Sequence, residues 1–135
     1  MPRTVRLILD SHILIAIALE RLDTVLPDFA RVIARPEMDL AASVASLWEI
    51  AIKSRLGKLD AGMPVEVLPD FFIASGIAIP PITAPHAVTR INPLPPTRDP
   101  FDRLLLAQCL IEGRRLVTID AALRDHPLAA GFGKS

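Results

Sequence analysis

The chain of 135 residues has one cysteine, one tryptophan and no tyrosine. A single cysteine, Cys109, excludes an internal disulfide and a zinc site built from several cysteines. Its place within an apolar segment predicts a buried, inert thiol. Long hydrophobic runs are also missing, because the longest spans only residues 13–19, whereas a helix needs about 20 residues to cross a bilayer. The first residues contain no signal-peptide core before Asp10, so we expect a protein of the cytoplasm.

The chain also lacks an excess of charge of either sign, because 15 Lys and Arg residues balance 15 Asp and Glu residues. Proteins that hold nucleic acid by charge alone are usually strongly basic, so nucleic-acid binding here would need a local patch, metal ions or a partner. Apolar residues are abundant, at 51%, with a mean hydropathy of +0.41. This apolar content is ample for one core, and we expect a single domain over residues 1–135. The high hydropathy without net charge also suggests that another chain covers some apolar surface.

Short apolar segments alternate with helical patterns, which indicates an α/β fold with a parallel sheet. The run Val5–Leu9 predicts a buried strand, and further strands are expected at 39–42, 77–79 and 115–119. Helices are expected at 13–19, 24–34, 43–56, 65–75 and 100–112, with a short one near Ala121. Seven of the 13 prolines lie between Pro80 and Pro100, which predicts turns around one short helix there.

Four acidic residues lie where a parallel α/β sheet binds ligands, at or near the carboxyl ends of strands. Asp10 and Asp120 directly follow expected strands, and Asp102 lies in the first turn of the helix that Asp99 opens. Glu49 lies within an apolar helix. Oxygen ligands suit hard divalent ions such as Mg²⁺ or Mn²⁺, and carboxylates that converge repel each other unless a cation offsets their charge. A cation site of this kind can activate water and stabilise a phosphoryl oxygen.

Each acid also has a purely structural interpretation. Asp10 and Asp120 can cap the helices that follow them, and Asp102 can favour the positive end of its helix. Glu49 can pair with Lys53 one turn later. However, Glu49 borders an apolar face, and a surface ion pair is a weak explanation for a carboxylate in that position. Taken singly, the structural interpretations are favoured. Taken together, the four acids favour a metal site.

Four segments of the chain carry these acids: LILDSHIL (7–14), ASLWEIAIK (45–53), DPFDRLLLAQ (99–108) and LVTID (116–120). In order and spacing they resemble PIN-domain proteins, and more closely the VapC-type toxins of prokaryotic toxin–antitoxin pairs. The resemblance covers about residues 5–123. It implies a PIN-like three-layer α/β/α sandwich with a central parallel sheet and an Mg²⁺-dependent ribonuclease site, for which Mn²⁺ is a plausible substitute.

The resemblance also implies roles for individual residues. The catalytic and metal-binding set would be Asp10, Glu49, Asp102 and Asp120. Residues expected to support this set are Ser11, Thr118 and Asp99. Basic residues expected to contact RNA are Lys53, Arg98 and Arg103, although solvated surface charge is the favoured interpretation for at least half of the basic residues near the motifs. The sequence departs from the family at Thr97, where many members have His, and at residues 129–132, which make a poor edge strand.

These features imply a metal-dependent endoribonuclease in which metal-activated water cleaves RNA. By resemblance it would be a toxin that dimerises and is held inactive by a cognate antitoxin. The alternatives are the same chemistry in housekeeping RNA processing and a catalytically dead α/β binding module. A signalling receiver domain would need adjacent acids after the first strand and a lysine after the last. Asp10 is instead followed by Ser11, and Asp120 by Ala121, which disfavours that class.

Two residues beside the motifs have competing interpretations. His12 follows the first acid and could contact the site, but a packing or capping role is favoured. Trp48 precedes Glu49, and a place in the core is favoured over a platform for base stacking.

Overall fold

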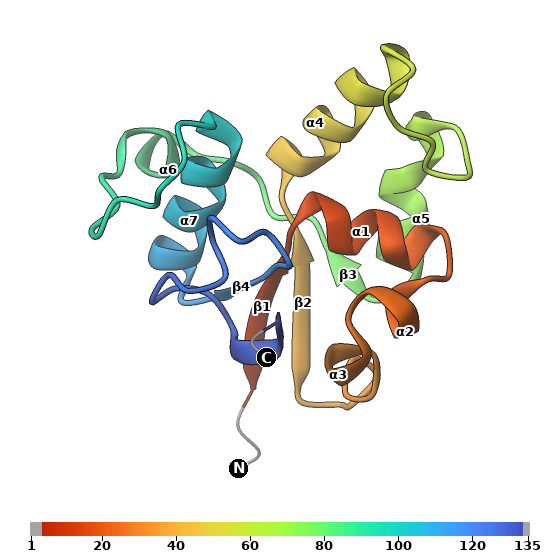
Figure 1. The fold of residues 1–135 in the computed structure, drawn as a ribbon, viewed down its shortest axis with the longest axis horizontal. Coiled ribbons are helices and arrows are strands. Elements are labelled where there is room, and N and C mark those ends of the chain that lie inside the picture. Colours follow the sequence, from red (N-terminus) through yellow and green to blue (C-terminus); the bar gives the residue numbers. More distant parts are fainter. Residues whose placement is uncertain (1–3, 134–135) are drawn as a thin grey trace.

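The computed structural model describes residues 4–133, so residues 1–3 and 134–135 of the expected domain lie outside the described residues. Its centre is a four-stranded, wholly parallel sheet in the order β3-β2-β1-β4 (Figure 1). The strands are β1 (Val5–Leu9), β2 (Met38–Ala42), β3 (Ile77–Ala78) and β4 (Arg115–Val117). All four expected strands form, and β4 ends two residues earlier than predicted.

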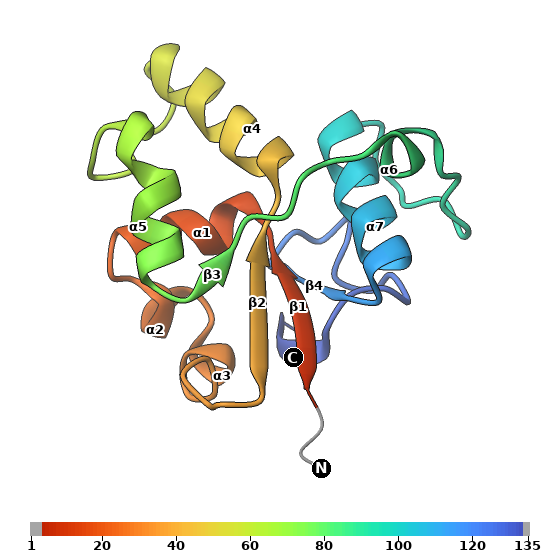
Figure 2. The same ribbon diagram turned by 180° about the vertical axis from the view of Figure 1, so that it is seen from behind.

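Side chains that alternate along the strands are buried on opposite faces of the sheet, and this places helices in two layers (Figures 1 and 2). Leu7 and Leu9 of β1 belong to one core cluster, whereas Ile8 belongs to the other. The first cluster includes residues of α1 (Ser11–Ala18), α2 (Leu22–Val25), α3 (Pro27–Ala30), α4 (Val44–Arg55) and α5 (Leu68–Ala74), which follows the short η1 (Val65–Val67). The second includes residues of α7 (Pro100–Glu112), against which α6 (Ala84–Val88) packs. The predicted α/β/α sandwich with a central parallel sheet is confirmed.

The helix predicted over 24–34 is wrong as a single element. Two short helices, α2 and α3, stand in its place, and the chain breaks between them at Leu26, whose φ is −146° and ψ is 75°. Pro27 explains the break, because its ring disfavours the helical conformation at the residue before it and it has no N–H to donate.

The C-terminal part also differs from the prediction. The short helix expected near Ala121 is a series of turns, in which Leu123 and Arg124 N–H donate to the Asp120 carbonyl at 3.0 and 2.9 Å. Pro127 disfavours a helical conformation at the residue before it, which limits any extension. Ala129 makes only an isolated bridge to Leu116, and η2 (Gly131–Gly133) follows. The expected poor edge strand is therefore confirmed. No helix within residues 4–133 is long and apolar enough to cross a membrane.

The helix α7 begins and ends as predicted. Asp99 caps it by accepting the Phe101 N–H at 2.9 Å, Pro100 is its first residue, and Gly113 ends it with a left-handed φ of 68°. Cys109 on α7 is buried, and this burial raises the pKa of its thiol to about 12. The thiol is thus inert, as predicted.

Candidate metal centre

The sheet order brings two of the four acids together. The strand β1 pairs with β2 on one side and with β4 on the other, with Leu9 opposite Val117. The N–H of Asp10 donates to the Val117 carbonyl at 3.1 Å, so the two strands end side by side. Asp10 follows β1 directly and Asp120 lies three residues beyond β4. A crevice at the carboxyl edge, where the chain places strands on both sides of β1, is the usual ligand position in such sheets.

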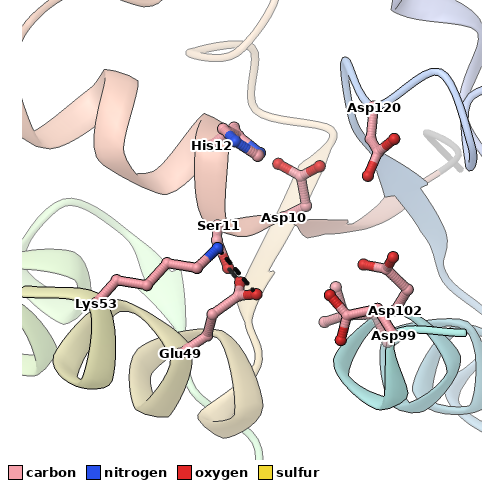
Figure 3. Close-up of a pocket in the computed structure, with 9 residues that line it drawn as sticks. Asp10, Ser11, His12, Glu49, Lys53, Asp99, Asp102 and Asp120 are labelled. Atoms are coloured by element: carbon pink, nitrogen blue, oxygen red, sulfur yellow. Dashed lines mark hydrogen bonds and ion pairs between the residues drawn. The ribbon is translucent and has the colours of Figure 1, made fainter. Parts of the chain in front are cut away.

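One cavity at this edge, of about 130 Å³, is lined by all four acids named from the sequence. Asp10 comes from the β1–α1 junction, Glu49 from α4, Asp102 from α7 and Asp120 from the segment after β4. Figure 3 shows these side chains around one shared space. The remaining lining residues are Ser11, His12, Lys53, Asp99 and Leu105.

Asp10 is the most buried of the four acids, with 4% of its surface exposed. Its Oδ1 accepts the Ile13 N–H at 3.1 Å, which caps α1, and its Oδ2 accepts a hydrogen bond from the Thr118 hydroxyl. Burial raises the pKa of Asp10, and the charge of Asp120 adds to this, while both hydrogen bonds oppose it. The capping interpretation is confirmed, but it does not exclude a chemical role, because the same carboxylate lines the cavity.

Glu49 is held from two sides. The Ser11 hydroxyl donates to its Oε1 at 2.5 Å, and Lys53 Nζ lies 3.4 Å from its Oε2. The Glu49 side chain keeps 14% of its surface exposed. The expected pair with Lys53 therefore forms, and the ammonium group lines the cavity together with the carboxylate.

Asp102 and Asp99 lie at the start of α7. Thr97 Oγ1 donates to Asp102 Oδ2 at 3.1 Å. Burial, with the neighbouring charge of Asp99 adding to it, raises the pKa of Asp102 to about 6, and the charges of Asp120 and Glu49 contribute further. The hydrogen bond from Thr97 opposes this rise. Thr97 was not named as a supporting residue, since the only signal was its place where the family often has His.

Thr118 connects Asp10 to Asp120. Its buried hydroxyl accepts the Asp120 N–H at 3.0 Å and donates to Asp10. Asp120 Oδ1 also accepts the Ala122 N–H at 2.9 Å. Thr118 therefore contacts Asp120, which follows it by two residues, whereas Ser11, next to Asp10 in the sequence, donates to Glu49.

The residues of the cavity fit a divalent cation by donor chemistry. Carboxylate oxygens are the ligands that Mg²⁺ and Mn²⁺ prefer, and a cation in the cavity would offset the neighbouring carboxylate charges that help to raise the pKa values of Asp10 and Asp102. Within residues 4–133, no group of three or more Asp, Glu, His or Cys side chains has the spacing to hold one ion directly. Mg²⁺ commonly keeps several waters and uses one or two carboxylates, so an ion fits this cavity with water between it and some of the acids.

The three basic residues named from the sequence are placed differently. Only Lys53 lines the carboxylate cavity. Arg103 is exposed, donates to the Thr97 carbonyl at 3.2 Å and lines a separate cavity beside α6. Arg98 is exposed and does not line the carboxylate cavity.

The interpretations of His12 and Trp48 were wrong. His12 is exposed and lines the cavity, instead of packing or capping. Trp48 is 63% exposed. Residues 46 and 50 of α4 are buried, and Trp48, two positions from each, points about 160° away from them on a helix of 3.6 residues per turn.

A family model for the PIN domain matches residues 7–127. The chain belongs to the PIN-domain family. The match spans all four acids named from the sequence, and PIN domains are generally nucleases that typically use divalent metal ions. This supports a nuclease that hydrolyses phosphodiesters and binds RNA. No curated protein matches the chain.

Proposed function

We propose that this PIN domain is an Mg²⁺-dependent endoribonuclease, in which Mn²⁺ can replace Mg²⁺. The observation that supports the proposal is the convergence of Asp10, Glu49, Asp102 and Asp120 on one cavity, although they come from four distant segments. Converging carboxylates cost free energy unless a cation offsets their charge. Such an arrangement is therefore better explained by chemistry than by stability.

The four acids would have different roles according to their positions in the cavity. Asp10 and Asp102 would hold the ion, directly or through water, and Asp120 and Glu49 would complete the acidic wall and orient waters. A bound divalent ion supplies a Lewis acid that activates water and stabilises charge on phosphoryl oxygens. Lys53 would hold an RNA phosphate beside the acids, since its ammonium lines the same cavity. Arg98 and Arg103, which do not line the carboxylate cavity, would contact the RNA backbone outside it.

Cleavage of RNA by the purified protein tests this proposal. We expect cleavage with Mg²⁺ or Mn²⁺ and none with EDTA. Asp10→Asn and Asp102→Asn should each lower the rate by at least about 100-fold, because even partners that only support the metal ligands typically cost about 10- to 100-fold. Asp70→Asn, at an exposed carboxylate in the first turn of α5, is the matched control and should cleave like the wild type. Metal-dependent cleavage at the wild-type rate in both variants would contradict the proposal.

We further propose that the nuclease is the toxin of a toxin–antitoxin pair, acts in the cytoplasm and is held inactive by a cognate antitoxin. The four segments that resemble VapC-type toxins support this. Expression of the protein alone should arrest growth, and Asp10→Asn should abolish the arrest. RNA cleavage in vitro without growth arrest would favour the housekeeping role in RNA processing.

A catalytically dead α/β binding module is the other alternative. It predicts RNA or protein binding that is unaffected by EDTA and by Asp10→Asn, with no cleavage under any metal condition. The presence of all four acids disfavours it.

We propose a homodimer of single-domain subunits, in which a second copy of the chain covers the apolar cavity beside Trp48. This cavity, of about 560 Å³, has almost wholly apolar walls that include Ile52, Ile82 and Phe101. The Trp48 and Phe101 rings meet edge to face at 5.7 Å. Two copies with zero net charge do not repel each other strongly.

Sedimentation tests the dimer. The wild type should sediment as two chains of 14.7 kDa each, and Trp48→Glu should sediment as one. Ile73→Glu, at a residue that is also exposed, by 58%, but lies on α5, is the control and should stay dimeric. A monomeric wild type at micromolar concentration would contradict this part of the proposal.

A further inference from the structure

Three of the four acids named from the sequence each accept a hydrogen bond from a hydroxyl group. The donor and acceptor pairs are Ser11 with Glu49, Thr118 with Asp10, and Thr97 with Asp102. Ser11 and Thr118 lie just beyond the carboxyl ends of β1 and β4. Thr97 comes from the irregular segment before α7, so its place in the same pattern needs its own explanation.

The proton of the Thr97 hydroxyl has a defined direction. Its Oγ1 accepts the N–H of Asp99 at 3.1 Å, so the single O–H proton is free to point to Asp102 Oδ2, also at 3.1 Å. The Thr97 backbone is fixed as well, because its N–H donates to the Pro95 carbonyl at 2.8 Å and its carbonyl accepts from Arg103 at 3.2 Å. Thr97 is therefore a rigid donor beside a half-buried carboxylate.

A rigid donor fixes the orientation of an aspartate that binds a cation. The last torsion of an aspartate side chain is broad, so a hydrogen bond to Oδ2 fixes the plane of the Asp102 carboxylate and leaves Oδ1 for a ligand.

We propose that Thr97 is a positioning residue for the metal site, which holds the Asp102 carboxylate in one orientation. The inference rests on the proposed function, since it gives Asp102 a cation to bind. Thr97 acts through Asp102 and does not line the cavity itself.

Calorimetric titration with Mn²⁺ tests the role of the hydroxyl. Thr97→Val removes the hydroxyl but keeps the branched shape, and it should weaken Mn²⁺ binding by about tenfold. Thr97→Ser keeps the hydroxyl and should retain most of the wild-type affinity. Thr89→Val is the matched control, because the Thr89 hydroxyl donates to the Pro85 carbonyl on α6 at 2.5 Å, outside the carboxylate cavity. Circular dichroism should show that all three variants are folded.

The outcomes separate this inference from the proposed function. If Thr97→Val binds Mn²⁺ as tightly as the wild type, or Thr97→Ser binds as weakly as Thr97→Val, the positioning role is overturned. If the wild type binds Mn²⁺ and the variants behave as expected but no RNA is cleaved, the positioning role holds and the nuclease proposal fails. In a cleaving enzyme, excess Mn²⁺ should restore the rate of Thr97→Val, because its defect lies in metal affinity.

Discussion

At the scale of single residues, the acids of the cavity combine structural and chemical positions. Asp10 caps α1 with one oxygen while its other oxygen accepts from Thr118, and Asp99 caps α7 while lining the same cavity. The caps fix these side chains at the starts of α1 and α7, and for Asp10 this position is also the end of β1. A structural role for each acid is thus compatible with a shared metal site.

The raised pKa of Asp102 predicts how stability depends on pH. Burial, with the charge of Asp99 adding to it, raises this pKa from 3.8 to about 6. Between these pH values the folded protein keeps a proton that the unfolded chain has lost, so this group's contribution to stability is full below pH 3.8 and is lost as the pH rises through 6. Asp102→Asn removes the titrating group.

We therefore expect the metal-free Asp102→Asn protein to melt at a higher temperature than the wild type at pH 7, with a smaller difference at pH 4. Melting curves in EDTA measure this. A variant that is less stable than the wild type at pH 7, by the same amount as at pH 4, would show that the Asp102 carboxylate carries no electrostatic cost.

Metal binding should stabilise the fold through Asp10. At Mn²⁺ concentrations 100 times the dissociation constant, binding contributes about 2.7 kcal/mol, which raises the melting temperature by roughly 8 °C for a chain of this size. Asp10→Asn should show only a small part of this rise. Each protein is melted with and without Mn²⁺, so the intrinsic stability of the variant cancels. An equal rise in both proteins would remove Asp10 from the site.

At the scale of elements, α4 and α7 carry acids to opposite sides of the cavity, and a buried contact joins the start of α4 to the C-terminal half of α7. The Ser43 hydroxyl accepts the Ala45 N–H at 3.0 Å, which caps α4, and donates to Gln108 Oε1 on α7. Both side chains are fully buried. Ser43 therefore fixes the position of the helix that carries Glu49 relative to the helix that carries Asp102.

Ser43→Ala should lower the free energy of unfolding by about 2 kcal/mol, because it removes a helix cap and leaves a buried amide oxygen without its donor. Urea denaturation measures the loss. Ser75→Ala, at an exposed serine that donates to the Phe71 carbonyl, is the control and should change stability by about 0.5 kcal/mol or less. Equal effects of the two substitutions would mean that the contact between α4 and α7 adds nothing.

The elements also show what a sequence pattern can predict. The strand β1 and the helix α7 were predicted with their bounds, because an unbroken apolar run and the sequence Asp99-Pro100 with Gly113 are strong local signals. The split between α2 and α3 was missed because apolar periodicity outweighed Pro27 in the prediction. The prediction that Trp48 lies in the core was wrong, because composition does not tell which apolar face of α4 is buried.

At the scale of the whole molecule, the parallel sheet explains why distant segments meet. The carboxyl ends of β1 and β4 are neighbours, and α4, which follows β2, and α7, which precedes β4, bring Glu49 and Asp102 to the same edge. Convergence of the four acids was predictable from this rule and from family resemblance. The contact of Thr97 was not, because the irregular segment before α7 has no periodicity from which a side-chain direction follows.

The most direct test of the account is the anomalous diffraction of a crystal soaked in Mn²⁺. The account predicts a peak inside the cavity, with Asp10 and Asp102 as ligands directly or through water and with Glu49 and Asp120 beside it. A crystal that shows no peak there at millimolar Mn²⁺, or shows the ion elsewhere with these carboxylates unchanged, would contradict the metal site and the nuclease mechanism built on it.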